Sequence, residues 1–366
     1  MDVSCRILMV NSLDSTYGST HRMRKFYHCL AEKGWNITYI ESNCRENIRV
    51  ISVFQPNNAL GFLWGSAVRT WFALTLRYDL LFTQTMTPLT LGPILAARMR
   101  RKKVAVDWDD LSWVLQKNSF RSFLVRWCEH SFIRRADIVF VPNRYLSEYG
   151  RRLGVRKVLL APHGVDFELF DPQRYNPTPV RQKLGLGNRT VLGFLASFTT
   201  GGVGDLDVIF EASKAVIEKL AGQVCLLVIG GGPLFDHARP QASAMGLKDI
   251  FFTGLISQED VPSYLSCVDI ALIFMRDDLK NTMKTSLKVG EYLAMDKRVV
   301  GHLTGQTRDD FARYCLECEP SVDSFIRRIL EAMGAPARCV DARSLLRGAY
   351  SWDISCRIID EALCAI

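Results

Sequence analysis

The sequence predicts an α/β protein with two Rossmann-like domains, each built on a parallel sheet. Short apolar segments rich in branched residues alternate with segments of helical period, which is typical of doubly wound sheets. A proline- and turn-rich stretch, 170–179, divides this series, and 366 residues are enough for two domains with separate cores. We therefore expect an N-terminal domain at 1–171, a C-terminal domain at 172–349 and a terminal helix at 350–366.

The first domain opens with an apolar strand at 5–10, a polar loop that contains Gly18, and a helix at 20–33 that ends at Gly34. Further apolar runs of strand length are separated by segments of helical period. We predict strands at 37–41, 48–53, 79–84, 103–107, 138–142 and 157–161. This order of strand, loop and helix indicates a Rossmann-like sheet.

The second domain repeats the pattern. We predict its strands at 190–196, 224–230, 250–253, 270–274 and 298–301. A helix at 286–295 lies between the last two strands, and Ser351 is the expected cap of the terminal helix. Only the architecture repeats, because the two halves share no sequence repeat.

Bulk properties exclude several classes of protein. Hydrophobic residues make up 48% of the chain, and the longest apolar tract, 59–76, contains Arg69, so no membrane-spanning helix is expected. The first residues lack the pattern of a signal peptide, and we expect a cytosolic chain. Eleven cysteines, mostly isolated, fit reduced core thiols. The pair Cys315 and Cys318 lacks the further ligands of a zinc site, so we expect no metal.

The basic excess lies in the first half of the chain. Residues 1–171 contain 24 Lys and Arg against 15 Asp and Glu, whereas 172–366 contain 22 against 23. In the segment 121–135 and the residue before it, arginines alternate with Phe120, Phe123, Trp127 and Phe132. Such a helix can lie on an anionic membrane surface, or its aromatic stripe can face the core with the arginines solvated. The pattern leaves both interpretations open.

The segment 269–300 is the most informative, because it places a strand, a polar loop, a helix and a second strand around Glu291. In a parallel sheet, such a loop lies at the carboxyl ends of the strands, where ligands bind. A helix start offers amide groups to an anion, and Lys284 and Lys288 add positive charge. Alternatively, Glu291 is an ordinary solvated carboxylate near a helix start.

The pattern K-x-x-E-Y-L-A-x-x-K-x-V-V, which runs from Lys288 to Val300, resembles the donor-binding segment of retaining GT-B glycosyltransferases of the family-four type. The motifs are closest to those of bacterial cell-surface polysaccharide transferases. This resemblance implies two sheets that face each other across a cleft, a terminal helix that crosses back to the first domain, and no cofactor or metal. It also implies that Glu291 holds the donor ribose, while Met283 stands where many members have a second Glu.

Other donor-binding residues follow from the same resemblance. The opening loop with Gly18 approaches the donor phosphates, and the loop that contains Thr199, Gly201 and Gly202 occupies the place of a phosphate-binding loop, although the Lys usual there is missing. The segments 229–238 and 251–272 match the family in order and composition, which implies that the backbone around Gly254 and Leu255 contacts the nucleobase. Taken alone, these glycines are ordinary turn residues.

Asp109 and Asp110 follow the strand at 103–107 and are the expected catalytic or acceptor-binding residues. Similar acidic patterns occur in enzymes that resemble teichuronic-acid transferases, but a helix cap is the alternative for Asp110. We interpret the D-x-D at 107–109 as a chance match to a manganese motif. His163 replaces the family's Asn at the domain boundary, where we expect a structural role.

The sequence thus predicts an enzyme of the hexosyl- and glycosyltransferase class. We expect it to move a sugar from a nucleoside diphosphate sugar to a hydroxyl of a lipid-linked or cell-surface glycan, with retention of configuration. Expected partners are the donor, the acceptor and an anionic membrane at the inner face of the cytoplasmic membrane, and no nucleic acid. A GT-B-fold sugar-nucleotide epimerase and a non-catalytic nucleotide-sugar-binding subunit remain as alternatives.

Overall fold

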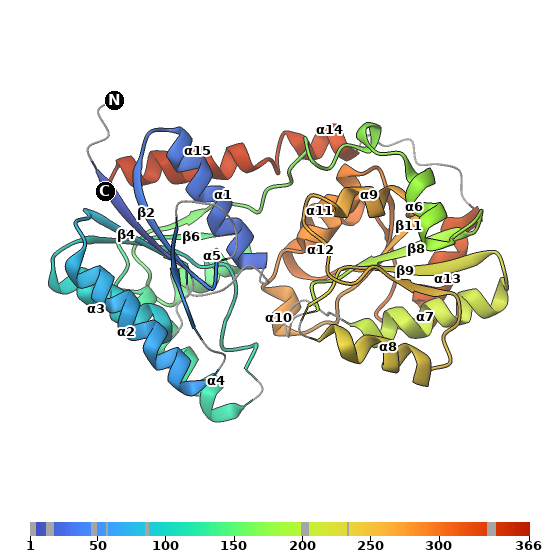
Figure 1. Cartoon of the computed structure of the whole chain (residues 1–366), viewed down its shortest axis with the longest axis horizontal. Helices are drawn as coiled ribbons and strands as arrows, with labels where there is room; N and C mark the ends of the chain where they lie inside the picture. The colour runs from blue at the N-terminus through green and yellow to red at the C-terminus, as the bar shows by residue number, and fades with distance from the viewer. Residues whose placement is uncertain are drawn as a thin grey trace. The chain divides into compact units, whose positions relative to one another are not determined.

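The structure, a computed structural model, describes residues 5–11, 18–44, 50–55, 58–84, 88–116, 118–198, 205–232, 234–334 and 342–366. The chain forms two compact units (Figure 1). Unit 1 comprises Met1–His163 and Trp352–Ile366, and unit 2 comprises Gly164–Ser351. The chain therefore passes between the units at 163/164 and 351/352, whereas the sequence suggested 171/172 and 349/350.

The strands of unit 1, among the described residues, form a seven-stranded sheet in the order β3-β2-β1-β4-β5-β6-β7, in which all pairs are parallel. They are β1 Arg6–Val10, β2 Asn36–Ser42, β3 Val50–Val53, β4 Leu80–Gln84, β5 Lys103–Asp107, β6 Ile138–Val141 and β7 Val158–Leu160. Each lies within two residues of its predicted bounds. The strand order reverses between β1 and β4, which is the point where ligands bind in such sheets.

The helices of unit 1 are α1 Gly18–Glu32, α2 Ala59–Thr75, α3 Pro88–Met99, α4 Ser119–Ile133, α5 Arg144–Arg152 and α15 Trp352–Cys364. Asn58, Asn118 and Asn143 cap α2, α4 and α5 by accepting backbone amide hydrogens. None of the described helices combines the length and the apolar character needed to cross a bilayer.

The terminal helix α15 belongs to the core of unit 1. It lies beside α1 (Figure 1), where Trp352 packs edge-on against Phe26 with ring centroids 6.0 Å apart. Lys33, the residue directly after α1, lies 3.0 Å from Asp360. Asp360 also accepts a hydrogen bond from Trp35. The aromatic and aliphatic face of α15 therefore completes the apolar layer on one face of the sheet.

Unit 2 contains a second parallel sheet, which among the described residues has six strands in the order β10-β9-β8-β11-β12-β13. The strands are β8 Thr190–Leu195, β9 Val224–Ile229, β10 Ile250–Phe252, β11 Ile270–Phe274, β12 Arg298–His302 and β13 Leu316–Glu317. Around it lie α6 Pro177–Leu184, α7 Leu206–Lys219, α8 Phe235–Ala244, α9 Val261–Ser266, α10 Leu279–Thr282, α11 Leu287–Ala294, α12 Gly305–Phe311, α13 Val322–Gly334 and α14 Ala342–Arg347. The short 3-10 helices are Pro172–Arg174 and Ala312–Tyr314.

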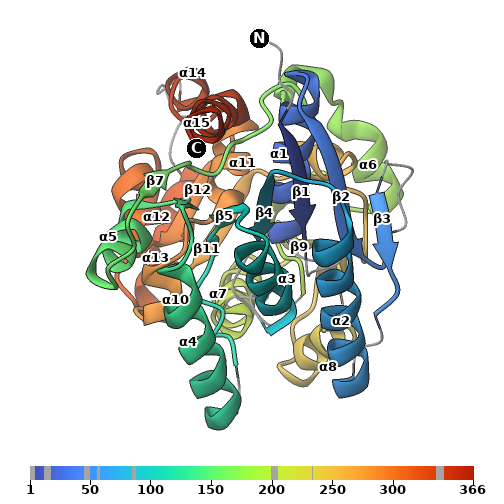
Figure 2. The same ribbon diagram turned by 90° about the vertical axis from the view of Figure 1, so that its left-hand side faces the viewer.

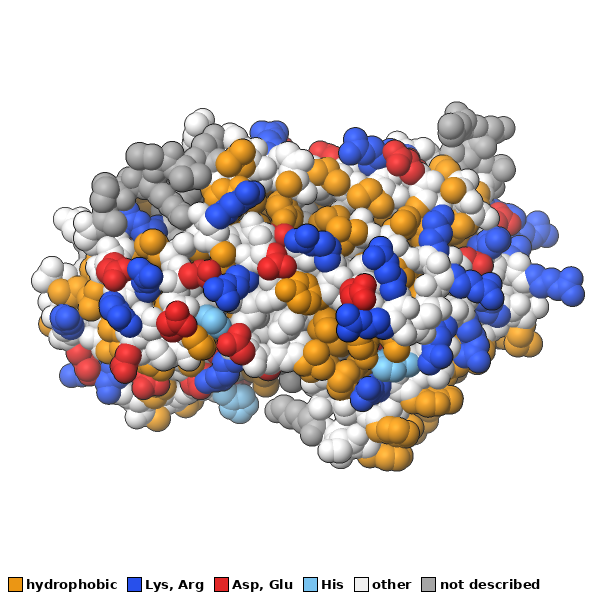
Figure 3. Space-filling view, turned by 180° about the vertical axis from the view of Figure 1, so that it is seen from behind, with side chains coloured by type: hydrophobic (Ala, Val, Ile, Leu, Met, Phe, Trp, Pro, Cys, Tyr) orange, Lys and Arg blue, Asp and Glu red, His pale blue; other side chains and the backbone are white. Residues whose placement is uncertain are grey.

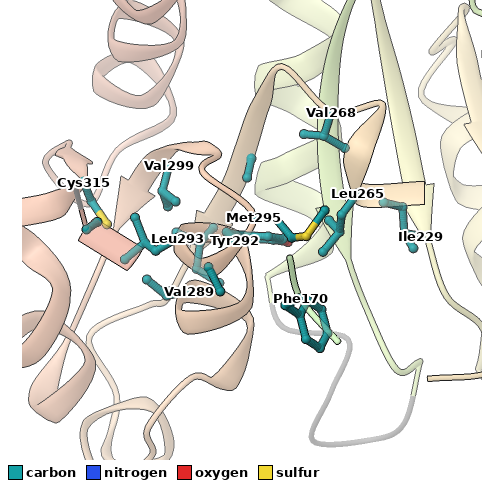
Figure 4. Packing of buried hydrophobic residues seen from close by; sticks show 14 of the residues in the cluster. Phe170, Ile229, Leu265, Val268, Val289, Tyr292, Leu293, Met295, Val299 and Cys315 are labelled. Carbon is teal, nitrogen blue, oxygen red and sulfur yellow. The ribbon is translucent and has the colours of Figure 1, made fainter. Parts of the chain in front are cut away.

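The helix α11 is fixed by the core of unit 2. Figure 4 shows Tyr292 and Leu293 among Leu265, Val289 and Met295 in a continuous apolar cluster. The Tyr292 hydroxyl accepts a hydrogen bond of 2.7 Å from the Leu195 amide at the end of β8. Because Tyr292 is anchored in this way, its neighbour Glu291 has a defined position at the carboxyl ends of the strands.

Candidate active site

The strand order of unit 2 reverses where β8 lies next to β11, so the loops after these two strands meet. Arg276, after β11, connects them: its Nη1 lies 2.8 Å from Asp205 Oδ1, and its Nη2 lies 2.7 Å from Asp207 Oδ2. The Arg276 amide also donates to Asp205. Asp205 and Asp207, at the start of α7, are thus paired with an arginine from the neighbouring loop.

Glu291 lies on α11 in a partly buried position. Gln258 Nε2 donates a hydrogen bond of 3.1 Å to Glu291 Oε1. Burial raises the pKa of Glu291 to about 7, against the lowering effects of Gln258 and Lys288. A carboxylate held in this way, with acceptor capacity beyond its one amide partner, can bind the hydroxyl groups of a ribose.

Lys288 lies one turn before Glu291 and is also partly buried. Burial and, to a smaller extent, the charge of Lys284 together lower its pKa to about 7. Lys288 Nζ lies 5.0 Å from the centroid of the Phe194 ring, on β8. A desolvated ammonium group interacts more strongly with an incoming anion than a solvated one does, because the surrounding dielectric constant is lower.

The backbone around Gly254 and Leu255 makes a close contact with the loop after β9. A Cβ added to Gly231 would lie 2.4 Å from the Leu255 backbone nitrogen, so this approach requires glycine. Gly254 has φ of +73°, in the left-handed region that glycine favours, and it pairs with Gly230 in an isolated bridge. Leu255 is exposed beside this contact.

Three other predicted donor-binding positions, Thr199, Gly201 and Gly202, lie outside the described residues. Gly18 is the first residue of α1, which follows β1 in unit 1. Lys284 lies between α10 and α11, directly after Met283, the C-cap residue of α10. Glu291, Lys284, Lys288, Gly254 and Leu255 thus all lie at the carboxyl ends of the unit 2 strands.

In unit 1, Asp109 lies in a buried cluster of charged groups. Arg22 of α1 holds Asp107 with two hydrogen bonds of 3.0 Å from Nε and one of 3.0 Å from Nη2, and its Nε lies 3.9 Å from Asp109 Oδ1. His163 Nε2 lies 2.9 Å from the same Asp109 oxygen. The D-x-D at 107–109 is therefore engaged by an arginine and a histidine.

Trp108, between Asp107 and Asp109, contacts α4 and α5. The Trp108 indole donates a hydrogen bond to Glu129 of α4, and Trp108 packs against Tyr149. Burial raises the pKa of Glu129 to about 8. Asp110 lies in a bend and does not cap a helix, since the next helix, α4, begins at Ser119 with Asn118 as its cap. The structure thus separates Asp109, which joins the cluster, from Asp110.

The helices α2, α3 and α4 form an exposed apolar surface with basic residues. Figure 2 shows the three helices next to one another, with α3 in contact with both neighbours. Exposed large apolar side chains on them, which we call the helix surface, are Leu60, Phe62, Leu63, Trp64, Trp71, Leu74, Leu95, Met99, Phe120, Phe123, Leu124 and Trp127. On the face drawn in Figure 3, hydrophobic side chains lie among Lys and Arg side chains. Most of the aromatic stripe on α4 does not face the core: Phe123 is 64% exposed and Trp127 57%, whereas Phe132 is buried.

Sequence reasoning missed four residues of these sites. Arg22 and Arg276 were not singled out as ion-pair partners, and Gln258 was not connected to Glu291. His163 was interpreted as a structural spacer, although it contacts Asp109. These contacts join positions that are 33 to 85 residues apart, so spacing along the chain gives no direct signal for them.

Comparison with known proteins finds a family match in the N-terminal part of the chain. Residues 18–164 match the family described as Glycosyl transferase 4-like domain. The match covers less than half of the chain. The matched segment contains Arg22, Asp107, Asp109 and His163, and the assignment to family-four-type glycosyltransferases made from the motifs is confirmed.

Two curated relatives of this domain family are named as glycosyltransferases. A teichuronic acid biosynthesis glycosyltransferase, TuaH, from Bacillus subtilis (strain 168) is 28% identical over 190 residues, which cover 50% of this chain and 45% of TuaH. A GDP-mannose-dependent alpha-(1-6)-phosphatidylinositol monomannoside mannosyltransferase from Mycolicibacterium smegmatis is 26% identical over 138 residues, or 37% of this chain and 35% of that protein. The matched segments thus span less than half of either relative.

Solved structures show the same fold over the whole chain. Sucrose-phosphate synthase from Thermosynechococcus elongatus has a TM-score of 0.76 at 15% identity and covers 98% of both chains. Anabaena HepE, crystallised with UDP and glucose, has a TM-score of 0.76 at 15% identity and covers 99% of this chain and all of its own. The predicted GT-B fold, with two parallel-sheet α/β domains, is confirmed.

Proposed function

We propose that this chain transfers a sugar from a nucleoside diphosphate sugar to a hydroxyl of a lipid-linked or cell-surface glycan, with retention of anomeric configuration. The observation that carries the proposal is that Glu291 and Lys288 lie one turn apart on α11, at the carboxyl ends of the unit 2 strands, both with pKa values shifted to about 7 by burial. A ribose-binding carboxylate and a phosphate-binding ammonium, one helical turn apart, match a nucleoside diphosphate. HepE, of the same fold, was crystallised with UDP-glucose, which supports a donor of this class.

In the proposed reaction, the acceptor oxygen forms a bond to the anomeric carbon while the bond from that carbon to the diphosphate breaks. The acceptor proton passes to the leaving diphosphate. Lys284, Lys288 and the amide groups at the start of α11 stabilise the charge that develops there, so we propose that no metal is needed. We propose that Asp109 is the carboxylate on the acceptor side of the reaction. Asp110, its neighbour in the same loop, stays a predicted site residue.

The helix surface supports an acceptor at a membrane. Large aromatic side chains surrounded by arginines match the interfacial region of an anionic bilayer, where each basic residue contributes about 1 kcal/mol. We therefore propose that unit 1 binds such a membrane reversibly. The lipid-linked substrate in the name of the mycobacterial relative supports this class of acceptor.

The test is transfer by the purified chain from UDP, GDP, dTDP and ADP sugars to octyl glycosides, with thermal shift used to find the donor that binds. We expect one donor class to raise the melting temperature and to support transfer. Glu291→Ala should abolish both effects. Glu259→Ala, which removes an exposed carboxylate in the same region, is the matched control and should leave both unchanged.

The same experiment distinguishes the alternatives. Deuterium incorporation into the donor without an acceptor would favour an epimerase, and donor binding without turnover would favour a non-catalytic subunit. Unchanged turnover in Glu291→Ala would overturn the site assignment. Sedimentation with phosphatidylglycerol vesicles tests the membrane proposal, which fails if the protein stays in the supernatant at low salt.

A further inference from the structure

His163 is the most constrained polar side chain that the proposed function leaves unused. It follows β7, at the carboxyl edge of the unit 1 sheet, and 9% of its side chain is exposed. Its Nε2 lies 2.9 Å from Asp109 Oδ1. Its other ring nitrogen, Nδ1, is buried and has no hydrogen-bond partner among the residues that the structure describes.

The backbone that carries His163 is held from two helices. Arg22 of α1 donates 2.7 Å and 3.3 Å hydrogen bonds to the carbonyl oxygens of Ala161 and Pro162. Ser355 of α15 donates a hydrogen bond to the same Pro162 oxygen. The ring itself packs edge-on against Trp352, with centroids 6.4 Å apart at 90°. The imidazole therefore has little freedom to turn, and Nδ1 keeps its direction.

The carboxylate of Asp109 decides which nitrogen carries hydrogen. A carboxylate only accepts, so a hydrogen is favoured on Nε2, 2.9 Å from Asp109 Oδ1, and in the imidazole with one hydrogen Nδ1 is then an acceptor. A buried acceptor without a partner is costly, and such groups in native proteins indicate a ligand or an ordered water. A phosphate oxygen offers Nδ1 no hydrogen, whereas a hydroxyl does.

We propose that Nδ1 of His163 accepts a hydrogen bond from a hydroxyl of the acceptor other than the attacking one, and that Asp109 acts as the positioning residue that fixes the ring tautomer. The inference rests on the proposed glycosyl transfer and specifies its acceptor side: the substrate group at this position is a sugar or alcohol hydroxyl. Arg22 holds Asp107 and the 161–162 backbone, so it positions both members of the pair. The D-x-D thus serves an arginine–carboxylate–imidazole cluster.

Two conservative substitutions distinguish the two ring nitrogens. The amide of Asn reaches the place of Nδ1, whereas the longer amide of Gln reaches the place of Nε2. With the octyl glycoside that supports transfer, we expect His163→Asn to keep the acceptor KM within about three-fold of the wild type. His163→Gln and His163→Ala should raise it about ten-fold, the effect of one lost hydrogen bond.

Donor measurements control for damage to the fold. The donor KM and the donor-induced thermal shift should stay unchanged in all three variants, while donor hydrolysis should rise relative to transfer in His163→Ala. A purely structural role would lower kcat and stability without changing that ratio. Equal acceptor KM values in all variants, or loss in His163→Asn with retention in His163→Gln, would overturn the inference.

A spectroscopic readout does not depend on turnover. Imidazole 15N spectra of the full chain, with His163→Ala for assignment, should show hydrogen on Nε2, and added octyl glycoside should shift the Nδ1 resonance. If the wild type transfers no sugar but this shift occurs, the proposed function fails and hydroxyl binding stands. If transfer occurs and Nδ1 does not respond, the inference fails and the proposed function stands.

Discussion

Lys288 shows how a single residue can be unfavourable for stability and still suit a ligand site. Its pKa is lowered to about 7 because its ammonium group is desolvated in the folded state. Protonation of Lys288 is therefore less favourable in the folded state than in the unfolded state. As a result, Lys288 lowers the free energy of unfolding below about pH 10. An anion bound at the site would offset this cost, which suits a buried lysine to a binding role.

We expect Lys288→Met to stabilise unit 2 by about 1 kcal/mol or more and to remove the donor-induced thermal shift. Methionine fills the same space beside Phe194 without a buried charge. Thermal melts with and without the donor measure both effects. Lys219→Met, at the exposed end of α7, is the control and should change neither. A destabilised Lys288→Met with normal donor binding would contradict this assignment.

The contacts of the site residues explain what a sequence can and cannot predict. Glu291, Lys288 and Gly254 were predicted to lie at strand ends because helical period and strand length locate the loops of a parallel sheet. The Gln258 contact, the Arg276 ion pairs and the His163–Asp109 approach depend on side chains from different loops. No local sequence pattern predicts these contacts between loops, because they form only when the complete sheet is packed.

At the scale of elements, α4 has two faces with different tasks. Its buried face carries Glu129, whose carboxyl group accepts from Trp108 and so fixes the loop that contains Asp109. Its exposed face carries the aromatic stripe of the helix surface. A buried and an exposed stripe were equally supported at the level of sequence, because arginines and aromatic residues alternate around the helix and amphipathicity is weak in that case.

We expect the buried face to make unit 1 sensitive to pH. Glu129 has a folded-state pKa of about 8, above the usual value of a glutamate, so its stabilising effect is present below about pH 4.5 and is lost as pH rises through 8. The free energy of unfolding falls by about 1.4 kcal/mol for each pH unit between these two pKa values. The free energy of unfolding of Glu129→Gln should equal that of the wild type near pH 5 and exceed it near pH 8.

Urea unfolding at both pH values measures this difference. Because Glu291 also has a raised pKa, the comparison is between the wild type and Glu129→Gln at each pH, which cancels the contribution of Glu291. Glu148→Gln, an exposed carboxylate on α5, should show no pH-dependent gain. A difference that is the same at pH 5 and pH 8 would show that Glu129 is ionised in the folded state.

We expect the exposed face of α4 to carry membrane binding. Phe123→Ser should weaken binding to phosphatidylglycerol vesicles about ten-fold, because one exposed aromatic side chain loses its apolar contact with the bilayer. Leu345→Ser, at a similarly exposed apolar position of α14, is the matched control. Cosedimentation across a salt series measures both. If the two variants bound vesicles equally well, α4 would not be the helix that contacts the membrane.

At the scale of the whole molecule, the two parallel sheets were predictable from the pattern of the sequence, whereas the return of the chain to unit 1 was implied only by the resemblance to a known family. Alternating strands and helices specify doubly wound sheets, and the proline-rich stretch marks a division. The terminal helix is amphipathic and would suit either core, so its period cannot tell which one it joins. The contacts of Trp352 with Phe26, and of Asp360 with Lys33, place it in unit 1.

This connectivity predicts that the units respond separately to perturbation. Trp352 is buried against α1 and His163, so Trp352→Ala should destabilise unit 1 by about 3 to 5 kcal/mol. The nucleotide donor binds at Glu291 and Lys288 and should stabilise unit 2 alone. Differential scanning calorimetry should therefore resolve two transitions, one lowered by the substitution and the other raised by the donor.

The control for this experiment is Lys33→Ala, which removes an exposed ion pair between α1 and α15. Exposed pairs contribute between about 0 and 1 kcal/mol, so the unit 1 transition should fall only slightly. If Trp352→Ala and the donor instead shifted one common transition, the two cores would unfold as a single cooperative unit. In that case, the helix that returns to unit 1 would transmit donor binding to the acceptor side, where it packs against His163.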